Sequence, residues 1–196
     1  MVFIQSMNNI SFTSQLTKNM TIQCRNGASN CSDKSVSIVE LDRHDSRDLD
    51  ALYAIGEDWS KQGFNYAPCI FTSAASDKDE SDWTDKIKEH YIALTLQEDN
   101  FDKLDPKKIL GLSLLSEYKY DNEIDFLQVK PTNSYSKVGA ERKYKKIGTT
   151  MLDYIKSISQ TKPIYVNSAV DAVDFYEMND FKRILKNDPT QLCYNA

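Results

Sequence analysis

A basic cluster lies directly before an amphipathic helix in this sequence, an arrangement suited to binding an anion. The cluster and the start of the helix consist of Arg142, Lys143, Tyr144, Lys145, Lys146, Ile147, Gly148 and Thr149. The helix is indicated by apolar residues that recur three and four positions apart from Ile147 to Ile158. The first N–H groups of a helix lack partners within it and the helix dipole is positive there, so both favour a negative ligand. A solvated loop or a nucleic-acid contact is the alternative, but the position of the cluster at a helix start favours phosphate binding.

The basic cluster follows two strand-like runs. Residues 109–115 form an apolar run with Gly111 inside it, and residues 123–129 form a second run after a polar turn. Pro131 ends the second run because proline has no N–H to donate to a strand ladder. If the second strand is regular, alternation places four side chains on one face: Glu123, Asp125, Leu127 and Val129.

The order of these segments resembles that of the GNAT superfamily of acetyl-CoA-dependent N-acetyltransferases, from about residue 36 to 186 and most sharply over 109–181. The family has a glycine in the strand before the hairpin, an L-x-V strand, a cofactor loop of form Q/R-x-x-G-x-G/A, and a later A-x-x-φ-Y-x-x-x-G-F segment. The matching positions here are Gly111, Leu127 with Val129, Lys143-x-x-Lys146-x-Gly148, and the segment from Ala172 through Phe175 and Tyr176 to Phe181. Lys146 and Asp180 stand at glycine positions of this pattern, and extra residues separate Val129 from the loop.

The resemblance implies that acetyl-CoA is the co-substrate. In the family the pantetheine arm lies between two diverging parallel strands and bonds to strand backbone, which points to Leu127 and Val129. The pyrophosphate would lie on the amides of residues 143–149, where the ammonium of Lys146 could pair with a phosphate. Gly148 would let the backbone approach the phosphates closely. We expect the parallel strands to separate just after Val129.

The resemblance also implies which residues carry the reaction, a direct attack of an amine on the acetyl thioester. Glu123 stands where histone-type members have their base, and Asp125 is the reserve candidate; the alternative is that both are surface acids. Tyr176 stands where the family has the general acid that protonates the leaving thiolate. The alternative for Tyr176 is a core residue, because a tyrosine at helical spacing usually packs.

The composition is that of a soluble globular domain. The chain has 196 residues, of which 40% are hydrophobic and 27% charged, and its net charge of −5 argues against a nucleic-acid partner. No apolar run approaches the roughly 20 residues that span a membrane, and no secretory signal is recognisable, so we expect a cytoplasmic protein. The four cysteines and two histidines lack metal-ligand spacing, so we expect neither a metal nor a structural disulfide.

Residues 1–34 are predicted to be a polar leader, disordered or extended against the domain, with a secretion address of a bacterial effector as the alternative. Residues 35–196 are predicted to form one α+β domain, a mixed and mostly antiparallel sheet with helices on both faces. Strands are expected at 35–41, 91–96, 109–115, 123–129, 163–166, 181–185 and 191–194, and helices at 46–62, 81–89, 147–158 and 170–178. A loop is expected over 64–80, and the 123–129 and 163–166 strands form a central parallel pair.

These patterns together predict an N-acetyltransferase that moves an acetyl group from acetyl-CoA to a primary amine of a small molecule or a protein. The alternative is a GNAT-fold acyl-CoA sensor or interaction module with weak or no activity, which Lys146, Asp180 and the long loop after Val129 favour. The acceptor and the oligomeric state are not indicated by the sequence.

Overall fold

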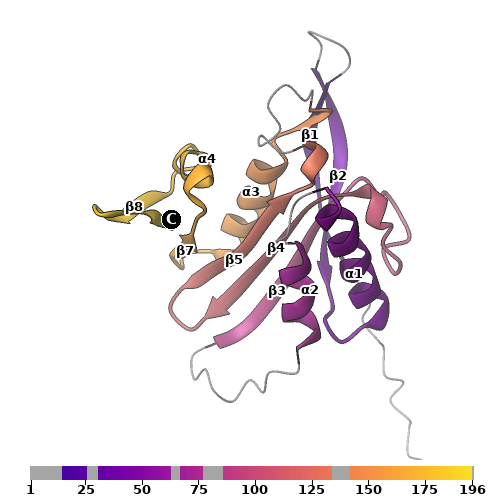
Figure 1. Ribbon diagram of the computed structural model, residues 1–196, viewed down its shortest axis with the longest axis horizontal. Coiled ribbons are helices and arrows are strands. Elements are labelled where there is room, and N and C mark those ends of the chain that lie inside the picture. Colours follow the sequence, from indigo (N-terminus) through magenta and orange to yellow (C-terminus); the bar gives the residue numbers. More distant parts are fainter. Residues whose placement is uncertain (1–14, 26–30, 63–66, 77–85, 134–141, 196) are drawn as a thin grey trace, which may run out of the picture.

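Nine strands of the described chain form one sheet in the order β6-β1-β2-β3-β4-β5-β7-β9-β8 (Figure 1). The computed structural model describes residues 15–25, 31–62, 67–76, 86–133 and 142–195. The strands are β1 (Gln15–Arg25), β2 (Cys31–Leu41), β3 (Lys86–Thr95), β4 (Ile109–Tyr118), β5 (Asn122–Val129), β6 (Tyr144–Lys145), β7 (Ile164–Asn167), β8 (Lys182–Leu185) and β9 (Asp188–Tyr194). The helices are α1 (Ser46–Ser60), α2 (Ala67–Ala75), α3 (Ile147–Ser159) and α4 (Val173–Glu177), with 3-10 turns η2 (Pro106–Lys108), η3 (Pro131–Asn133) and η4 (Val170–Ala172).

The predicted fold class is confirmed by the directions of these strands. β5 and β7 run parallel, and every other neighbouring pair in the sheet is antiparallel. Two parallel strands need a crossover connection, and α3 lies in the connection between β5 and β7. β3, β4 and β5 form the expected meander, and β8 and β9 form the expected final hairpin. The sheet therefore has the mixed, mostly antiparallel architecture that the GNAT resemblance implied.

Two hydrophobic cores lie on opposite faces of the sheet. The α3-side core joins the sheet to α3 and α4, and it includes Ile38, Ile92, Leu94, Met151, Leu152, Ile155, Val166, Val173 and Tyr176. The α1-side core joins the sheet to α1 and α2, and it includes Val39, Leu52, Ile55, Trp59, Ile70, Tyr91, Ala93 and Leu112. Successive strand residues alternate between the two cores, as the pleat requires. Figure 1 shows α1 and α2 in front of the sheet and α3 behind it.

Helix α1 begins where its sequence offers a cap. The Asp45 side chain accepts a hydrogen bond from the Arg47 amide at 2.8 Å, and the Asp48 carboxylate in the first turn accepts one from the Asp42 amide at 2.8 Å. The Asp45 bond satisfies a donor that the helix leaves without a partner, and the Asp48 bond ties the first turn to the chain that leaves β2. They fix the start of α1 at the end of β2.

The described part of the predicted polar leader is extended against the domain, one of the two alternatives expected, and it forms a strand of the sheet itself. Residues 15–25 form β1, which pairs antiparallel with β2, and β2 begins at Cys31 rather than at Ser35. Met20 and Ile22 pack into the α3-side core, which stabilises the strand. The remaining leader residues, 1–14 and 26–30, lie outside the described residues.

Two predictions between α1 and β3 are also corrected. The loop expected over 64–80 contains α2, whose Ile70 and Ala74 are buried in the α1-side core. The helix expected over 81–89 is strand β3 from Lys86 onward, and residues 81–85 lie outside the described residues. In both places short apolar runs were misassigned because the contacts that decide them come from distant strands.

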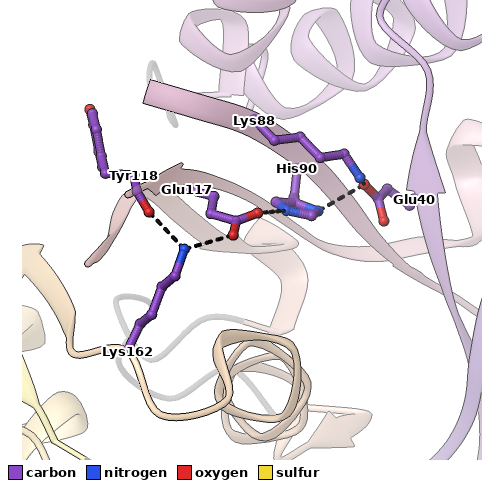
Figure 2. A network of polar contacts seen from close by, with 6 residues as sticks. All are labelled: Glu40, Lys88, His90, Glu117, Tyr118 and Lys162. Carbon is purple, nitrogen blue, oxygen red and sulfur yellow. Dashed lines mark hydrogen bonds and ion pairs between the residues drawn. The ribbon is translucent and has the colours of Figure 1, made fainter. Parts of the chain in front are cut away.

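A row of charged side chains crosses three strands on the α3 side of the sheet (Figure 2). His90 of β3 lies between two carboxylates, with Nδ1 2.8 Å from Glu40 of β2 and Nε2 3.4 Å from Glu117 of β4. Lys88 donates to Glu40 at 2.9 Å. Burial alone would raise the pKa of Glu40, but the hydrogen bonds from His90 and Lys88 outweigh it and bring that pKa to about 2.

The same row anchors the start of β7. Lys162 donates to Glu117 at 2.8 Å and to the Tyr118 carbonyl at 2.7 Å, as Figure 2 shows. The Asn122 amide donates to the Pro163 carbonyl at 2.9 Å. These contacts fix β7 beside the turn between β4 and β5, so they also fix the point from which β5 and β7 diverge.

Candidate cofactor and active site

The parallel strands β5 and β7 separate earlier than the sequence suggested. In the described chain their ladder holds three pairs, from Asn122 with Ile164 to Ile124 with Val166, so the prediction of a separation after Val129 is wrong. The register between β4 and β5 shifts at the same point, because Leu114 pairs with Phe126 and Leu115 with Ile124. Asp125 is therefore the extra residue of a β-bulge, and a bulge bends and twists its strand.

Beyond the bulge, the backbone of β5 presents polar groups on the side from which β7 has departed. The Lys130 amide donates to Leu110 of β4 at 2.7 Å. Backbone groups alternate between the two sides of a strand in an antiparallel ladder, so those of Val129 and Leu127 face the β7 side. This is the backbone arrangement that was expected to hold a pantetheine arm.

The bulge also divides the four β5 side chains that alternation had placed on one face. Leu127 and Val129 pack on the α3-side core, together with Ile124. Asp125 lies on the other face, because its carboxylate accepts a hydrogen bond from Ser116 at 2.5 Å and Ser116 is the cross-strand partner of Glu123. The prediction of a shared face is therefore wrong, and both acids lie on the α1 side.

The start of α3 is open in the way the anion hypothesis requires. The first bond within the helix runs from the Thr150 amide to the Lys146 carbonyl at 2.9 Å, which leaves the amides of Ile147, Gly148 and Thr149 ahead of it. No side chain of the described residues caps this end. The Lys146 side chain is exposed beside these amides.

The rest of the predicted cradle has other bonds. The Tyr144 amide donates to the Asn133 side chain at 3.3 Å, and Tyr144 and Lys145 form β6, which pairs with Cys24 and Gln23 of β1. The amides that could receive a pyrophosphate therefore belong to the first turn of α3 rather than to the whole run from 143 to 149. Arg142 and Lys143 stand further back, before β6.

The two residues that replace family glycines both adopt left-handed backbone. Lys146 has φ 64° and ψ 14°, and Asp180 has φ 68°. This region is easy for glycine and costs other residues free energy because of their Cβ. At Asp180 the turn is held by Lys156, whose ammonium donates to the Asn179 carbonyl at 2.7 Å and lies 3.5 Å from the Asp180 carboxylate. Both departures from the family pattern thus keep the backbone conformation that glycine would take.

Two glycines let helices approach closely. A Cβ at Gly148 would lie 2.8 Å from Cζ of Phe175 in α4, and one at Gly111 would overlap the Met151 sulfur of α3. The Phe175 ring thus occupies the space that a side chain at position 148 would take. Gly148 therefore has a packing role in addition to its expected role in letting the backbone approach a phosphate. Gly111 seats α3 on β4.

Tyr176 lies in the α3-side core with 5% of its surface exposed. Its ring makes edge contacts with Phe175 and Phe181, at centroid distances of 5.1 and 5.3 Å. Burial raises the pKa of the Tyr176 hydroxyl, so the group stays protonated at neutral pH. A protonated hydroxyl is the form that could donate a proton to a leaving thiolate.

Three neighbours of these residues were not expected from the sequence. Ser116 bonds to Asp125, Asn133 bonds to the Tyr144 amide, and Arg25 donates its amide to the Lys143 carbonyl at 2.8 Å. The alternation of Met20 and Ile22 with polar residues is a signal that could have revealed β1, and with it Arg25. The serine and the asparagine carry no such pattern.

Among the described residues no group of three His, Cys, Asp or Glu side chains could hold a metal ion. No helix in the described chain has the length and hydropathy needed to cross a bilayer.

No protein-family model and no curated protein matches the sequence. Among solved structures, the PaiA N-acetyltransferase from Thermoplasma acidophilum in complex with coenzyme A is similar, at 17% identity and TM-score 0.48, covering 81% of this chain and 96% of its own. ElaA from Escherichia coli has 15% identity and TM-score 0.44, covering 80% and 96%. The anti-CRISPR protein AcrVA5 has 18% identity and TM-score 0.36, covering 44% and 90%. Similarities this weak assign neither a family nor an activity, so the α+β fold class rests on the strand order described above.

Proposed function

We propose that this protein is an N-acetyltransferase that moves an acetyl group from acetyl-CoA to a primary amine. The observation that carries the proposal is the combination of an open β5 backbone edge beyond Ile124 with the uncapped start of α3. A thioester on a pantetheine arm with a pyrophosphate at its other end is the kind of ligand that uses both features. The amine belongs to a small molecule or a protein.

In this proposal the pantetheine arm runs along β5 and bonds to the backbone of Leu127 and Val129. The pyrophosphate binds the amides of Ile147, Gly148 and Thr149, where the positive end of the helix dipole favours it. The ammonium of Lys146, exposed at the helix start, pairs with a phosphate oxygen as a point charge. Without an anion this end of α3 is unfavourable, because a cation lies at the positive end of a dipole.

The acceptor amine enters from the α1 side, where both acids of β5 lie. Its nitrogen attacks the thioester carbonyl carbon, a carboxylate takes the proton that the nitrogen loses, and the carbon–sulfur bond breaks as the amide forms. We propose Asp125 as the base, because it is the first residue beyond the β5–β7 ladder, and Glu123 as the second candidate. The thiolate takes its proton from the Tyr176 hydroxyl.

A base contributes substantially to this reaction. A lysine-like amine has a pKa near 10.4, so about one molecule in 2,500 is neutral at pH 7, which corresponds to about 4.6 kcal/mol. Removing the proton in the site offsets part of this cost, and positioned acids and bases typically raise rates by about 10²- to 10⁴-fold.

Calorimetric titration with acetyl-CoA tests the cofactor site. We expect micromolar affinity, about −7 to −8 kcal/mol, that weakens as salt screens the lysine. Lys146→Gly should keep most of the affinity, because the amides remain, whereas Lys146→Glu should lose at least about tenfold. Equal affinities for the wild type and Lys146→Glu would remove the lysine from the site, and no binding to wild type would refute the proposal.

An amine screen that reads released thiol then tests the reaction. Turnover on any amine supports the enzyme, and loss of that turnover in Asp125→Asn, with Glu123→Gln compared beside it, identifies the base. Tight binding of acetyl-CoA without turnover on small amines, peptides or proteins would instead favour an acyl-CoA sensor.

A further inference from the structure

Strand β1 contributes a cation to the loop that leads into α3. Gln23 pairs with Lys145 and Cys24 with Tyr144, and the Arg25 amide donates to the Lys143 carbonyl at 2.8 Å. The same antiparallel register places Arg25 opposite Lys143. Side chains directly opposite each other on paired strands have Cβ atoms about 4.5–5.5 Å apart.

Three cations share one face of this β1–β6 ribbon. Tyr144 packs against the α3-side core, so alternation turns Lys143 and Lys145 to the other face, and Arg25 alternates with Cys24 in the same way. Lys143 and Lys145 are exposed and Arg25 is half-buried. Successive residues on one strand face are about 6.5–7 Å apart. A single phosphate group is small enough to contact all three side chains.

The lysines of this loop concentrate positive charge at the start of α3. Lys146 and the positive end of the helix dipole follow within three residues of Lys143. Within the described residues no carboxylate forms an ion pair with Lys143, Lys145 or Lys146, and the Lys143 ammonium lies 5.4 Å from the Tyr144 ring centroid. The chain as a whole has a net charge of −5, so this local excess of cations stands out.

We propose that Arg25, Lys143 and Lys145 bind the 3′-phosphate of coenzyme A and make the protein selective for CoA over 3′-dephospho-CoA. This inference rests on the proposed function, which places the pyrophosphate at the start of α3, directly after the ribbon. The 3′-phosphate is a monoester that carries close to two negative charges at pH 7, since its second pKa is near 6. It lies on the ribose next to the pyrophosphate, so the ribbon is the adjoining surface of the right charge.

The decisive experiment compares CoA with 3′-dephospho-CoA by calorimetric titration of the full chain at low salt. We expect wild type to prefer CoA by about tenfold or more, as charge-assisted contacts to a phosphate require. Arg25→Gln and Lys145→Gln should each lower the affinity for CoA several-fold and leave the affinity for 3′-dephospho-CoA unchanged. Lys182→Gln is the matched control, because Lys182 is an exposed strand lysine in β8 at the opposite edge of the sheet.

The other outcomes separate a failure of this inference from a failure of the proposed function. Equal affinities of wild type for the two ligands would overturn this inference and leave the proposed function standing. Equal losses for both ligands in Arg25→Gln and Lys145→Gln would show a general effect on the loop, which also overturns it. If neither ligand binds wild type, the proposed function is wrong and the inference falls with it.

Thermal unfolding of the same variants without ligand separates binding from structure. Lys145→Gln should melt at or above the wild-type temperature, because it relieves repulsion on the ribbon. A lysine that only supported the fold would lower the melting temperature when replaced.

Discussion

Replacing Lys146 by glycine should stabilise the protein in the absence of ligand. Lys146 has φ 64°, and a non-glycine residue in this left-handed region costs about 1–2 kcal/mol. Glycine also raises the conformational entropy of the unfolded chain, which reduces the stability gained from relieving this strain by about 0.4–1 kcal/mol. Removing a cation from the positive end of a helix adds about 0.3–1 kcal/mol. We therefore expect Lys146→Gly to raise the free energy of unfolding by about 1–1.5 kcal/mol, from backbone and charge together.

Lys146→Ala is the control that separates these two contributions. Alanine removes the charge but keeps a Cβ in the left-handed conformation, so it should give only the dipole part, about 0.5 kcal/mol. For a chain of this size 1 kcal/mol shifts the melting temperature by about 2–4 °C, so calorimetry in low-salt buffer without phosphate resolves the glycine and alanine variants. If glycine stabilises no more than alanine, the backbone at Lys146 is not strained and the reasoning from φ is refuted.

Three further predictions follow from other contacts. Tyr176→Phe should lower turnover by about 10²- to 10⁴-fold while stability and acetyl-CoA affinity barely change, because the hydroxyl acts only when the thiolate leaves. Turnover is measured as released thiol. Full turnover in this variant would leave Tyr176 with a purely structural role. Glu40→Gln should cost about 3 kcal/mol of stability near pH 7, since the pKa of Glu40 is lowered from 4.5 to about 2. A carboxyl group whose pKa is lower in the folded protein than in the unfolded chain stabilises the fold above the unfolded-state pKa, and this stabilisation is lost as the pH falls. The melting temperatures of wild type and Glu40→Gln should therefore converge between about pH 4.5 and 2. A difference in melting temperature that stays constant with pH would contradict this. Gly148→Ala should lower the free energy of unfolding by about 1–3 kcal/mol, because the new Cβ would clash with the Phe175 ring. Adding Phe175→Leu to this variant should recover most of the lost stability, as measured by urea unfolding. If no stability is recovered, the clash is not with Phe175.

Much of the fold could be predicted because it depends on local pattern. The period of the apolar residues in α3 and the antiparallel meander ending at Pro131 are both encoded in short stretches of sequence. The parallel pairing of β5 with β7 followed from the helix between them. Strand β1 was missed because its polar residues resemble a leader, and only the pairing with β2 shows otherwise.

The predicted site residues fared differently for a physical reason. The β-bulge at Asp125 reverses the alternation of β5, and no residue type in Glu123–Val129 announces it. By contrast, the sequence shows that Lys146 and Asp180 stand at glycine positions of the family pattern, but it does not show that both adopt a left-handed backbone conformation. The catalytic and cofactor roles assigned to these side chains remain predictions for the experiments above.

The pairing of β1 with β6 has a consequence for how the protein becomes functional. Cys24 and Tyr144 are partners across roughly 120 residues of chain, and contacts of such long range form late because the intervening loop must first be closed. The loop before α3 is completed by β1 and β6, the first and the sixth of the nine described strands in chain order. During synthesis, therefore, the ability to bind an anion at this loop should appear only after the chain from β1 through α3 has been made, which makes anion binding a report of folding across that length of chain.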